Sequence, residues 1–297
     1  MKWIWAWTAI LAVAFVTGSA MADEEQAVPG TKPAKALVYK TIGDVKLQLH
    51  VFLPPDGTPA NVPAIAFFFG GGWTGGNPTQ FYEQCKYFAA RGMVAISAEY
   101  RIKSLHGTSA VECVKDGKSA IRWVRAHAAE LGVDPAKIVA GGGSAGGHVA
   151  ACTGVIEGFE DENDDHTVSS RPAALVLFNP VLEIPENSRF ADRFQGHQKE
   201  LSPLGHAAKG CPPMIVFHGT ADTTVPFASV ERFRDKMKEA GNICEIVPFK
   251  GEKHGFFNFS RNRNAFDATM AAADAFLVAQ GILKPAAPEN SAEKKRP

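Results

Sequence analysis

Cysteine is scarce in this chain of 297 residues, and neither sign of charge is in excess. Five cysteines are too few for a disulfide scaffold in a chain of this length. The 31 Lys and Arg side chains balance 31 Asp and Glu side chains, so we expect no nucleic-acid partner. The sequence also lacks internal repeats, H-E-x-x-H and paired C-x-x-C motifs, which gives metal catalysis no support. With 45% hydrophobic residues, it is typical of an ordinary globular protein.

The longest apolar run, over residues 4–16, is shorter than the roughly 20 residues that cross a bilayer. Lys2 precedes it, and residues 20–22 (Ala-Met-Ala) form the small-x-small pattern of a signal-peptidase site. A membrane anchor is the alternative, but acidic residues follow at once. We predict a signal peptide over residues 1–22, cleaved after Ala22, and a secreted or periplasmic protein without an integral membrane span. In that oxidising compartment the cysteines could include a disulfide, although their odd number leaves at least one unpaired.

Short apolar runs alternate with helical patterns along most of the chain. Residues 45–52 alternate apolar and polar side chains, as in a partly exposed antiparallel strand, and residues 36–42 precede them as a hairpin partner. Later runs lack this alternation, as strands covered on both faces do. These runs are 64–69, 94–97, 138–140, 174–178, 214–217 and 243–247. Apolar residues recur at helical spacing over 111–131, 227–240 and 265–278.

This alternation predicts an α/β fold with a mostly parallel central sheet, an antiparallel N-terminal hairpin and helices on both faces. No polar linker divides the chain, so we expect one domain over 36–282. A leader over 23–35 should precede it, and a mobile tail over 283–297 should follow. The stretches 158–171 and 182–212 interrupt the alternation, and we expect them to be excursions above the sheet.

The most informative segment is 137–148, where an apolar strand runs into a glycine-rich turn and a helix. Residues 142–146 (Gly-Gly-Ser-Ala-Gly) match the G-x-S-x-G nucleophile elbow, in which strained backbone exposes the hydroxyl of Ser144. The same segment matches G-x-G-x-x-G, with Asp161 as a candidate ribose-binding acid. That dinucleotide fingerprint opens the first βαβ unit, whereas more than a hundred residues precede it here. We therefore interpret Ser144 as a nucleophile.

A serine nucleophile needs a base, an orienting acid and donors for the oxyanion. Asp222 follows the strand predicted over 214–217, and His254 follows the next strand along the chain. Catalytic groups gather at the carboxyl ends of parallel strands, so these residues are the predicted triad partners of Ser144. Residues 70–72 are three glycines after another buried strand. The predicted oxyanion donors are the backbone N–H groups of Gly71, Gly72 and Ala145.

These separated motifs resemble the α/β-hydrolase superfamily, in particular its acetyl-esterase, hormone-sensitive-lipase-like and feruloyl-esterase-like group. The motifs are Gly70-Gly71-Gly72-Trp73, Tyr100-Arg101, Gly132-Val133-Asp134-Pro135, the elbow at 142–147, and the Asp222 and His254 loops. The resemblance covers about residues 36–282. It implies an eight-stranded sheet, carboxylic-ester hydrolysis and no cofactor. Phe69 stands where the family commonly has the His of His-Gly-Gly-Gly, so the glycine loop is expected to lack that imidazole's hydrogen bonds.

Several other residues have competing interpretations. Trp73, beside the glycine loop, is a candidate substrate contact. His148 lies one helical turn past Ser144 and is interpreted as a packed helix residue, while His218 is expected to support the Asp222 loop. Cys152 lies among small helix residues and is interpreted as an inert buried thiol. The acidic residues in 160–165 could bind calcium, but they lack a Gly-spaced ligand loop, which favours a solvated acidic loop.

Together these observations predict a secreted serine ester hydrolase that works through an acyl-enzyme. Export, a neutral surface and the lack of a long apolar lid favour short acyl groups on small-molecule or polysaccharide-linked esters, acetyl or feruloyl above all. A serine peptidase on the same scaffold is an alternative, since such a triad also attacks amides. An inactive relative that binds carbohydrate or a partner is a second alternative, motivated by Phe69, although a complete triad argues against it.

Overall fold

The computed structural model of the protein describes residues 32–55, 57 and 60–286. The predicted signal peptide over 1–22 lies outside these residues, as does most of the predicted leader and tail. Within the described residues, no helix combines the length and apolarity needed to cross a membrane.

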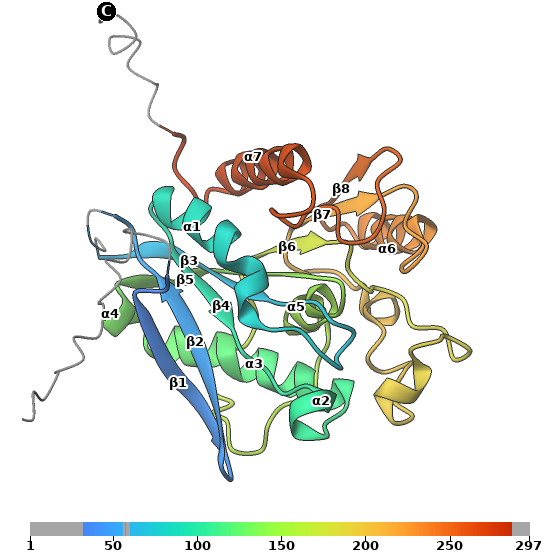
Figure 1. Cartoon of the computed structure of the whole chain (residues 1–297), viewed down its shortest axis with the longest axis horizontal. Coiled ribbons are helices and arrows are strands. Elements are labelled where there is room, and N and C mark those ends of the chain that lie inside the picture. The colour runs from blue at the N-terminus through green and yellow to red at the C-terminus, as the bar shows by residue number, and fades with distance from the viewer. Residues whose placement is uncertain (1–31, 56, 58–59, 287–297) are drawn as a thin grey trace, which may run out of the picture.

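One sheet of eight strands forms the centre of the molecule (Figure 1). Its strands are β1 (Lys35–Ile42), β2 (Val45–Phe52), β3 (Val62–Phe68), β4 (Val94–Ala98), β5 (Val133–Gly143), β6 (Ala174–Phe178), β7 (Met214–Gly219) and β8 (Cys244–Phe249). They lie in the order β1-β2-β4-β3-β5-β6-β7-β8. The pairs β1/β2 and β2/β4 are antiparallel, and every other pair is parallel. The predicted α/β fold, with its antiparallel N-terminal hairpin, is confirmed.

Burial along the strands follows the sequence patterns. Every residue of β4, β6 and β7 is buried, as expected for apolar runs that are covered on both faces. In β2, by contrast, buried residues at Leu47, Leu49 and Val51 alternate with partly exposed neighbours. The hairpin forms one edge of the sheet, and the carboxyl ends of the parallel strands lie along the same side of it.

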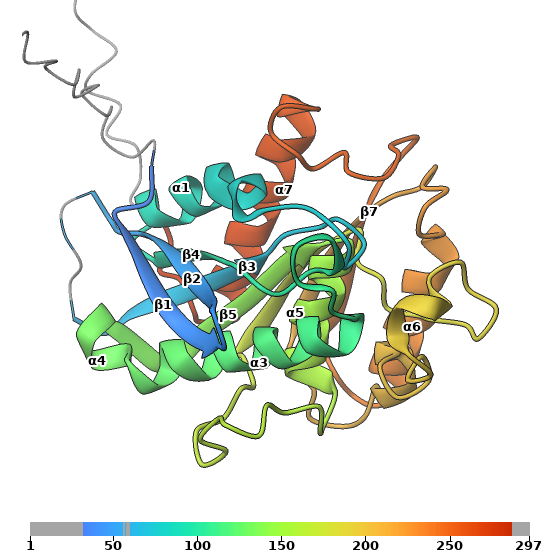
Figure 2. The same cartoon turned by 60° about the horizontal axis from the view of Figure 1, so that its bottom comes forward.

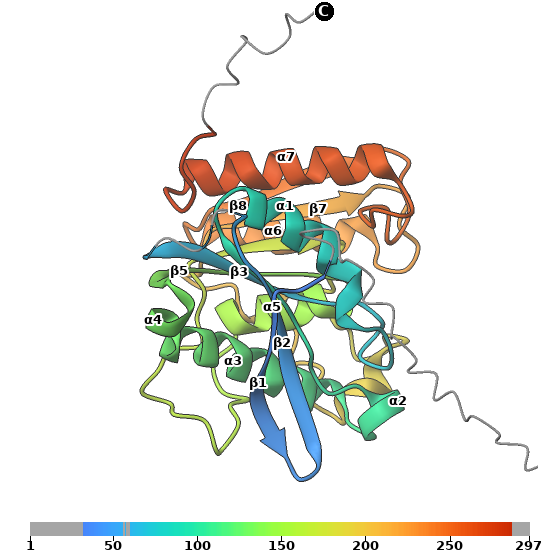
Figure 3. The same ribbon diagram turned by 60° about the vertical axis from the view of Figure 1, so that its left-hand side comes forward.

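Helices cover both faces of the sheet. Figures 2 and 3 show α1 (Tyr82–Ala90) and α7 (Arg263–Ala279) on one face and α3 (Ala110–Ala126) and α5 (Ala145–Val155) on the other. The remaining helices are α2 (Lys103–His106), α4 (Ala128–Leu131) and α6 (Phe227–Glu239). All residues of α5 are buried, because this helix lies between the sheet and α3.

The prediction of a single helix over residues 111–131 is wrong in one respect, because two helices cover this range. Ser109 and Glu112 form a capping box that starts α3, but the chain leaves helical geometry at His127 before α4 begins. Gly132 then ends α4 in the left-handed conformation, with φ at 70°. The helical spacing continues across the break, so periodicity alone does not reveal it.

The two predicted excursions differ from each other. Residues 182–212 hold the short 3-10 helices η2 (Ala191–Phe194) and η3 (Pro203–His206). Residues 158–171 hold no helix or strand and lie beside α3, where three of their carboxylates are paired, while Glu162 and Asp165 are exposed as expected of a solvated loop. The ion pairs join Glu160 to Lys118 and Arg122, Asp164 to Arg122, and Asp161 to Lys40. In the described part of the chain, no cluster of three or more acidic, His or Cys side chains could hold a metal ion.

The five cysteines are all free thiols in the structure, and four of them are buried. Cys152 is fully buried on α5, and its burial raises the pKa of its thiol far above the usual value. Burial likewise raises the pKa of the Cys244 thiol to about 12. A thiol that stays protonated is a poor nucleophile, in keeping with the interpretation of Cys152 as inert.

Candidate active site

Ser144 lies at the turn between β5 and α5, in strained backbone. Its φ is 55° and its ψ is −116°, a conformation that non-glycine residues rarely adopt. The turn is tight because α5 begins directly against β3: a Cβ on Gly146 would lie 2.0 Å from the carbonyl oxygen of Phe68. Only glycine fits there, which explains why the elbow pattern ends in this residue.

The structure brings Ser144, Asp222 and His254 together, although each follows a different strand. His254 Nε2 lies 2.8 Å from Ser144 Oγ, and His254 Nδ1 lies 2.7 Å from Asp222 Oδ2. Asp222 is in the loop after β7, and His254 is in the loop after β8. Both hydrogen bonds have the lengths that a nucleophile, base and acid require.

The Asp222 carboxylate is held by three hydrogen bonds and a further contact from His218. Oδ1 accepts from the backbone N–H groups of Thr224, at 2.8 Å, and Val225, at 2.9 Å. Oδ2 contacts His254, and His218 Nε2 lies 3.3 Å away while also donating to the Val225 carbonyl. Burial alone would raise the pKa of Asp222, but the hydrogen bonds from His218, His254 and Val225 outweigh it and hold the pKa well below its usual range. The carboxylate is therefore ionised and fixed in orientation.

The glycine loop lies against Ser144. A Cβ on Gly70 would lie 3.4 Å from Ser144 Cβ, so the loop and the nucleophile are in direct contact. Gly71 and Gly72 have φ values of 133° and 62°. Glycine adopts such positive φ values readily, because it has no Cβ, whereas other residues rarely do. Within the described residues, the N–H groups of Gly71 and Gly72 donate to no acceptor. Ala145 is the first residue of α5, and its N–H has no partner within the helix.

Other groups support the glycine loop in place of the missing imidazole at position 69. Gln80, in the 3-10 helix η1 (Pro78–Phe81), accepts the Gly70 N–H at 2.6 Å through its Oε1. The buried Tyr100 hydroxyl donates to the carbonyl of Phe69 at 2.5 Å, and the two rings stack with centroids 4.2 Å apart. None of the sequence motifs includes Gln80. Asn77-Pro78, a helix-start signal shortly after the glycines, could have placed it in the turn beside them.

A pocket of about 400 Å³ opens above Ser144. Its wall includes the glycine loop, the His254 loop and residues of the 182–212 excursion, among them Phe190 and Arg193. Trp73, the candidate substrate contact, belongs to this wall, but its side chain is only 1% exposed. The indole packs edge-on against Phe190 and Phe194. A role in direct substrate contact therefore stays a prediction, whereas a role in shaping the pocket follows from its packing.

His148, on α5, supports the Trp73 indole through a hydrogen bond. It is fully buried, accepts a hydrogen bond from Trp73 Nε1 at 3.2 Å and donates from Nε2 to the Leu201 carbonyl at 2.8 Å. Burial lowers the pKa of His148 to about 4, so the ring is neutral near pH 7. The His148 ring forms no hydrogen bond with a side chain of the triad, and its backbone N–H donates to the Ser144 carbonyl at 3.0 Å as part of α5. This agrees with its interpretation as a packed helix residue.

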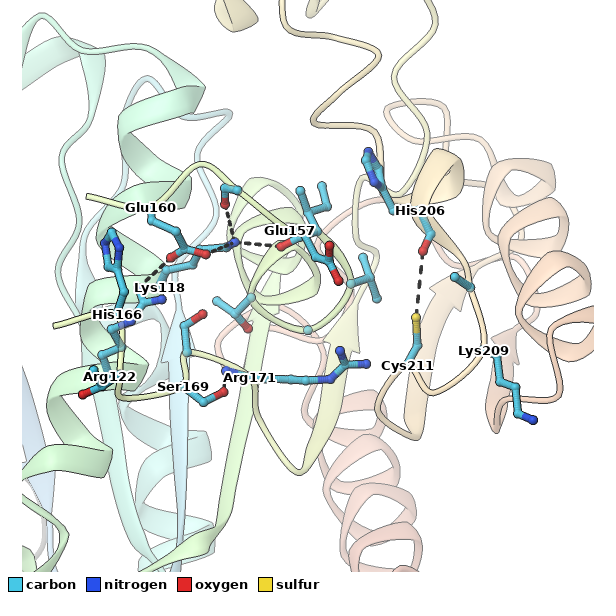
Figure 4. Close-up of a pocket in the computed structure, with 18 residues that line it drawn as sticks. Lys118, Arg122, Glu157, Glu160, His166, Ser169, Arg171, His206, Lys209 and Cys211 are labelled. Carbon is cyan, nitrogen blue, oxygen red and sulfur yellow. Dashed lines mark hydrogen bonds and ion pairs between the residues drawn. The ribbon is translucent and has the colours of Figure 1, made fainter. Parts of the chain in front are cut away.

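A second pocket, of about 410 Å³, lies between α3, α5 and the 158–171 segment and contains no triad residue (Figure 4). Lys118 crosses it and donates to the carbonyls of Ile156 and Gly158, at 2.7 and 2.5 Å, and to Glu160 at 2.8 Å. Glu160 also accepts from Arg122 at 2.6 Å. Lys118 and Arg122, the cations at the centre of this second pocket, are thus already paired within the chain. The pocket above Ser144 is the better candidate for catalysis.

Comparisons with known proteins show which families this chain resembles. A family model described as BD-FAE matches residues 49–184, and the model of the dienelactone hydrolase family matches residues 188–285. Carboxylesterase NlhH of Mycobacterium tuberculosis is 32% identical over 263 residues, which are 78% of this chain and 79% of that protein. A probable isoprenylcysteine alpha-carbonyl methylesterase, ICMEL1 of Arabidopsis thaliana, is 27% identical over 70% of this chain. This chain spans about half of the length of ICMEL1, 48%.

The similarity to solved structures is stronger. The apo form of Thermogutta terrifontis esterase 2 is 52% identical, with a TM-score of 0.83, and the match covers 86% of this chain and 98% of that one. Other structures of that esterase are described as propionate bound, butyrate bound and phosphorylated by paraoxon. Fold, motif order and relatives thus agree, and the chain belongs to the α/β-hydrolase superfamily, in its hormone-sensitive-lipase-like group of esterases.

Proposed function

We propose that this protein hydrolyses carboxylic esters by nucleophilic catalysis at Ser144. The observation that carries the proposal is the pair of short hydrogen bonds that joins Ser144 Oγ to His254 and His254 to Asp222. The neutral imidazole accepts through Nε2, because its Nδ1–H is fixed on the ionised Asp222. The esterase names of the relatives support the same activity.

The proposed reaction has two halves. In the first, Ser144 Oγ attacks the acyl carbonyl as His254 takes its proton, and the imidazolium returns that proton to the leaving alcohol. In the second, water attacks the acyl-enzyme with the same imidazole as base, which releases the carboxylic acid and restores Ser144. The N–H groups of Gly71, Gly72 and Ala145, which donate to no acceptor among the residues that the structure describes, would stabilise the negative oxygen in each tetrahedral intermediate.

We infer that the acyl group is short. The pocket of about 400 Å³ suits a small ester, and the propionate and butyrate complexes described for the T. terrifontis esterase support this size class. Acetyl groups on small-molecule or polysaccharide-linked alcohols remain our leading proposal, with feruloyl groups as the other carbohydrate-linked class. Export to the periplasm or cell exterior is proposed from residues 1–22 of the sequence alone.

Ser144→Ala and Asp222→Asn test the mechanism. On p-nitrophenyl acetate, we expect kcat to fall by about 10³-fold or more in each variant, since the nucleophile is lost or the imidazole takes the wrong tautomer. Ser104→Ala, an exposed serine on α2, is the matched control and should retain wild-type turnover. Wild-type turnover in Ser144→Ala would disprove the mechanism. A rate on p-nitrophenyl octanoate above that on the acetyl and butyryl esters would disprove the short-acyl proposal.

A further inference from the structure

Two arginine side chains line the pocket above Ser144, and no Asp or Glu of the described residues lines it with them. Arg193 comes from η2, in the 182–212 excursion, and Arg261 comes from the segment that follows the His254 loop. The wall of the pocket therefore carries two positive charges from separate parts of the chain. Neither the proposed mechanism nor the sequence motifs assign a role to them.

Arg193 is held in place by the glycine loop. Its Nη1 donates to the Gly72 carbonyl at 2.8 Å, and its guanidinium carbon lies 5.1 Å from the centre of the Phe190 ring. Burial and the nearby charge of Arg189 lower the pKa of Arg193, yet an arginine remains charged near neutral pH. In the described part of the chain, no carboxylate forms an ion pair with Arg193. Its charge is thus fixed beside the site and uncompensated.

Arg261 lies beside the catalytic imidazole's own loop. A Cβ on Gly255 would lie 3.2 Å from Arg261 Nη1, so the guanidinium tip reaches the residue directly after His254. The backbone N–H of Arg261 donates to the Asn258 carbonyl at 2.9 Å, which fixes the turn that carries the side chain. No ion pair with Arg261 is recorded among the described residues. Arg261 thus lines the part of the pocket next to His254, the residue that protonates the leaving alcohol in the proposed mechanism.

Three other cations that are largely buried have carboxylate partners. In the second pocket (Figure 4), Lys118 pairs with Glu160, and Arg122 pairs with Glu160 and Asp164. Lys40 lies 2.8 Å from Asp116 and 2.7 Å from Asp161. Arg193 is half-buried, so solvent screens its charge less than the charge of Arg261, which is exposed although it lines the pocket. Without counter-ions, both guanidinium groups add to the positive potential of the pocket wall. A carboxylate fits such a group well, because guanidinium donates to both of its oxygens.

We propose that the preferred substrates are esters whose alcohol part carries a carboxylate, which Arg261 binds with support from the charge of Arg193. This inference rests on the proposed esterase function and adds the substrate class. Binding occurs on the alcohol side, so the carboxylate leaves with the first product and no part of it stays on the acyl-enzyme.

The test uses two acetyl esters of the same shape, 4-acetoxybenzoate and its uncharged analogue 4-acetoxybenzamide. The readout is the ratio of their kcat/KM values, which cancels any general loss of activity in a variant. We expect Arg261→Gln to lower the ratio by about 5- to 10-fold, as the loss of one charge-assisted contact implies. Arg263→Gln is the matched control, because Arg263 is an exposed arginine like Arg261 but pairs with Asp267 and does not line the pocket. Arg193→Lys keeps the charge and should largely keep the ratio.

A second measurement needs no variant. In the wild-type protein, added salt should lower kcat/KM for 4-acetoxybenzoate and leave that for 4-acetoxybenzamide nearly constant. An unchanged ratio in Arg261→Gln, or equal salt dependence for the two esters, would overturn the inference. So would a charge preference confined to the acyl side, measured with monoethyl succinate against ethyl succinamate. Hydrolysis of neither acetyl ester would instead overturn the proposed function, which keeps the two failures distinct.

Discussion

Gln80 Nε2 donates a hydrogen bond of 3.0 Å to Asn258 Oδ1 and so joins the glycine loop to the loop that follows His254. The Oε1 of the same side chain accepts the Gly70 N–H, and Asn258 Nδ2 donates to the Gly255 carbonyl at 2.8 Å. One amide side chain therefore connects the proposed oxyanion donors with the proposed base. Gln80 and Tyr100 together support the glycine loop, because Phe69 has no imidazole that could do so.

Gln80→Leu removes both hydrogen bonds and nearly keeps the side-chain volume. We expect kcat for p-nitrophenyl acetate to fall by about 10- to 100-fold, because the oxyanion donors lose their alignment, while KM changes by less than about threefold. Gln80→Glu keeps an acceptor for the Gly70 N–H and should recover part of kcat. Equal kcat in wild type and Gln80→Leu, or a change in KM alone, would show that Gln80 does not position the loop.

His148→Ala should destabilise the protein by about 2–4 kcal/mol near pH 7.5, because the Trp73 N–H and the Leu201 carbonyl lose their partner and a cavity forms. The folded-state pKa of His148 is about 4, below the usual 6.5. The wild type therefore loses stability as the pH falls from 6.5 toward 4, since the unfolded state binds the proton first. The difference between wild type and variant should shrink over that range in urea unfolding.

His197→Ala is the control for this series, because His197 is an exposed histidine. It should lower the free energy of unfolding much less than His148→Ala. A pH-independent difference between wild type and His148→Ala would contradict the neutral buried imidazole.

Asp161→Asn tests the ion pair between the 158–171 segment and β1. Burial would raise the pKa of Asp161, but hydrogen bonds from Lys40 and the Asn163 N–H outweigh it and lower the pKa to about 2. The carboxylate therefore stabilises the fold fully above its unfolded pKa, near 4, and this contribution is lost as the pH falls toward 2. After allowance for solvent screening, we expect a loss of about 1 kcal/mol at pH 7.

Thermal unfolding at pH 7 and pH 2 measures this contribution. Asp235→Asn, whose exposed carboxylate pairs with the adjacent Arg234, should leave Tm nearly unchanged. If Asp161→Asn and the wild type had the same Tm at pH 7, the pairing of this acidic segment would have no role in stability.

The sequence predicts those parts of the structure that local patterns determine. All eight strands, the elbow at Ser144 and the loops of Asp222 and His254 follow from apolar runs and turn residues within a few positions of each other. The break at His127 is not predicted, because the helical spacing continues through it. Contacts through space are missed for a different reason: Gln80 and Asn258 are 178 positions apart, and neither lies in a recognisable motif.

The positive pocket wall is missed for the same reason. Arg193 lies in an irregular segment whose path over the sheet has no periodic signal, and only folding brings it to Gly72. Arg261 resembles any exposed loop arginine in the sequence. Motif order therefore predicts where the chemistry occurs, while the groups that position it and select its substrate depend on tertiary structure.

The central claim is that Ser144 is a nucleophile activated by His254, and covalent labelling tests it most directly. The intact protein is treated with paraoxon, digested, and the modified peptide is identified by mass spectrometry. We predict one diethyl phosphate group per chain, on Ser144, with labelling at least about 10³-fold slower in His254→Ala. An adduct on another residue, or equally fast labelling of Ser144 without the imidazole, would contradict the claim.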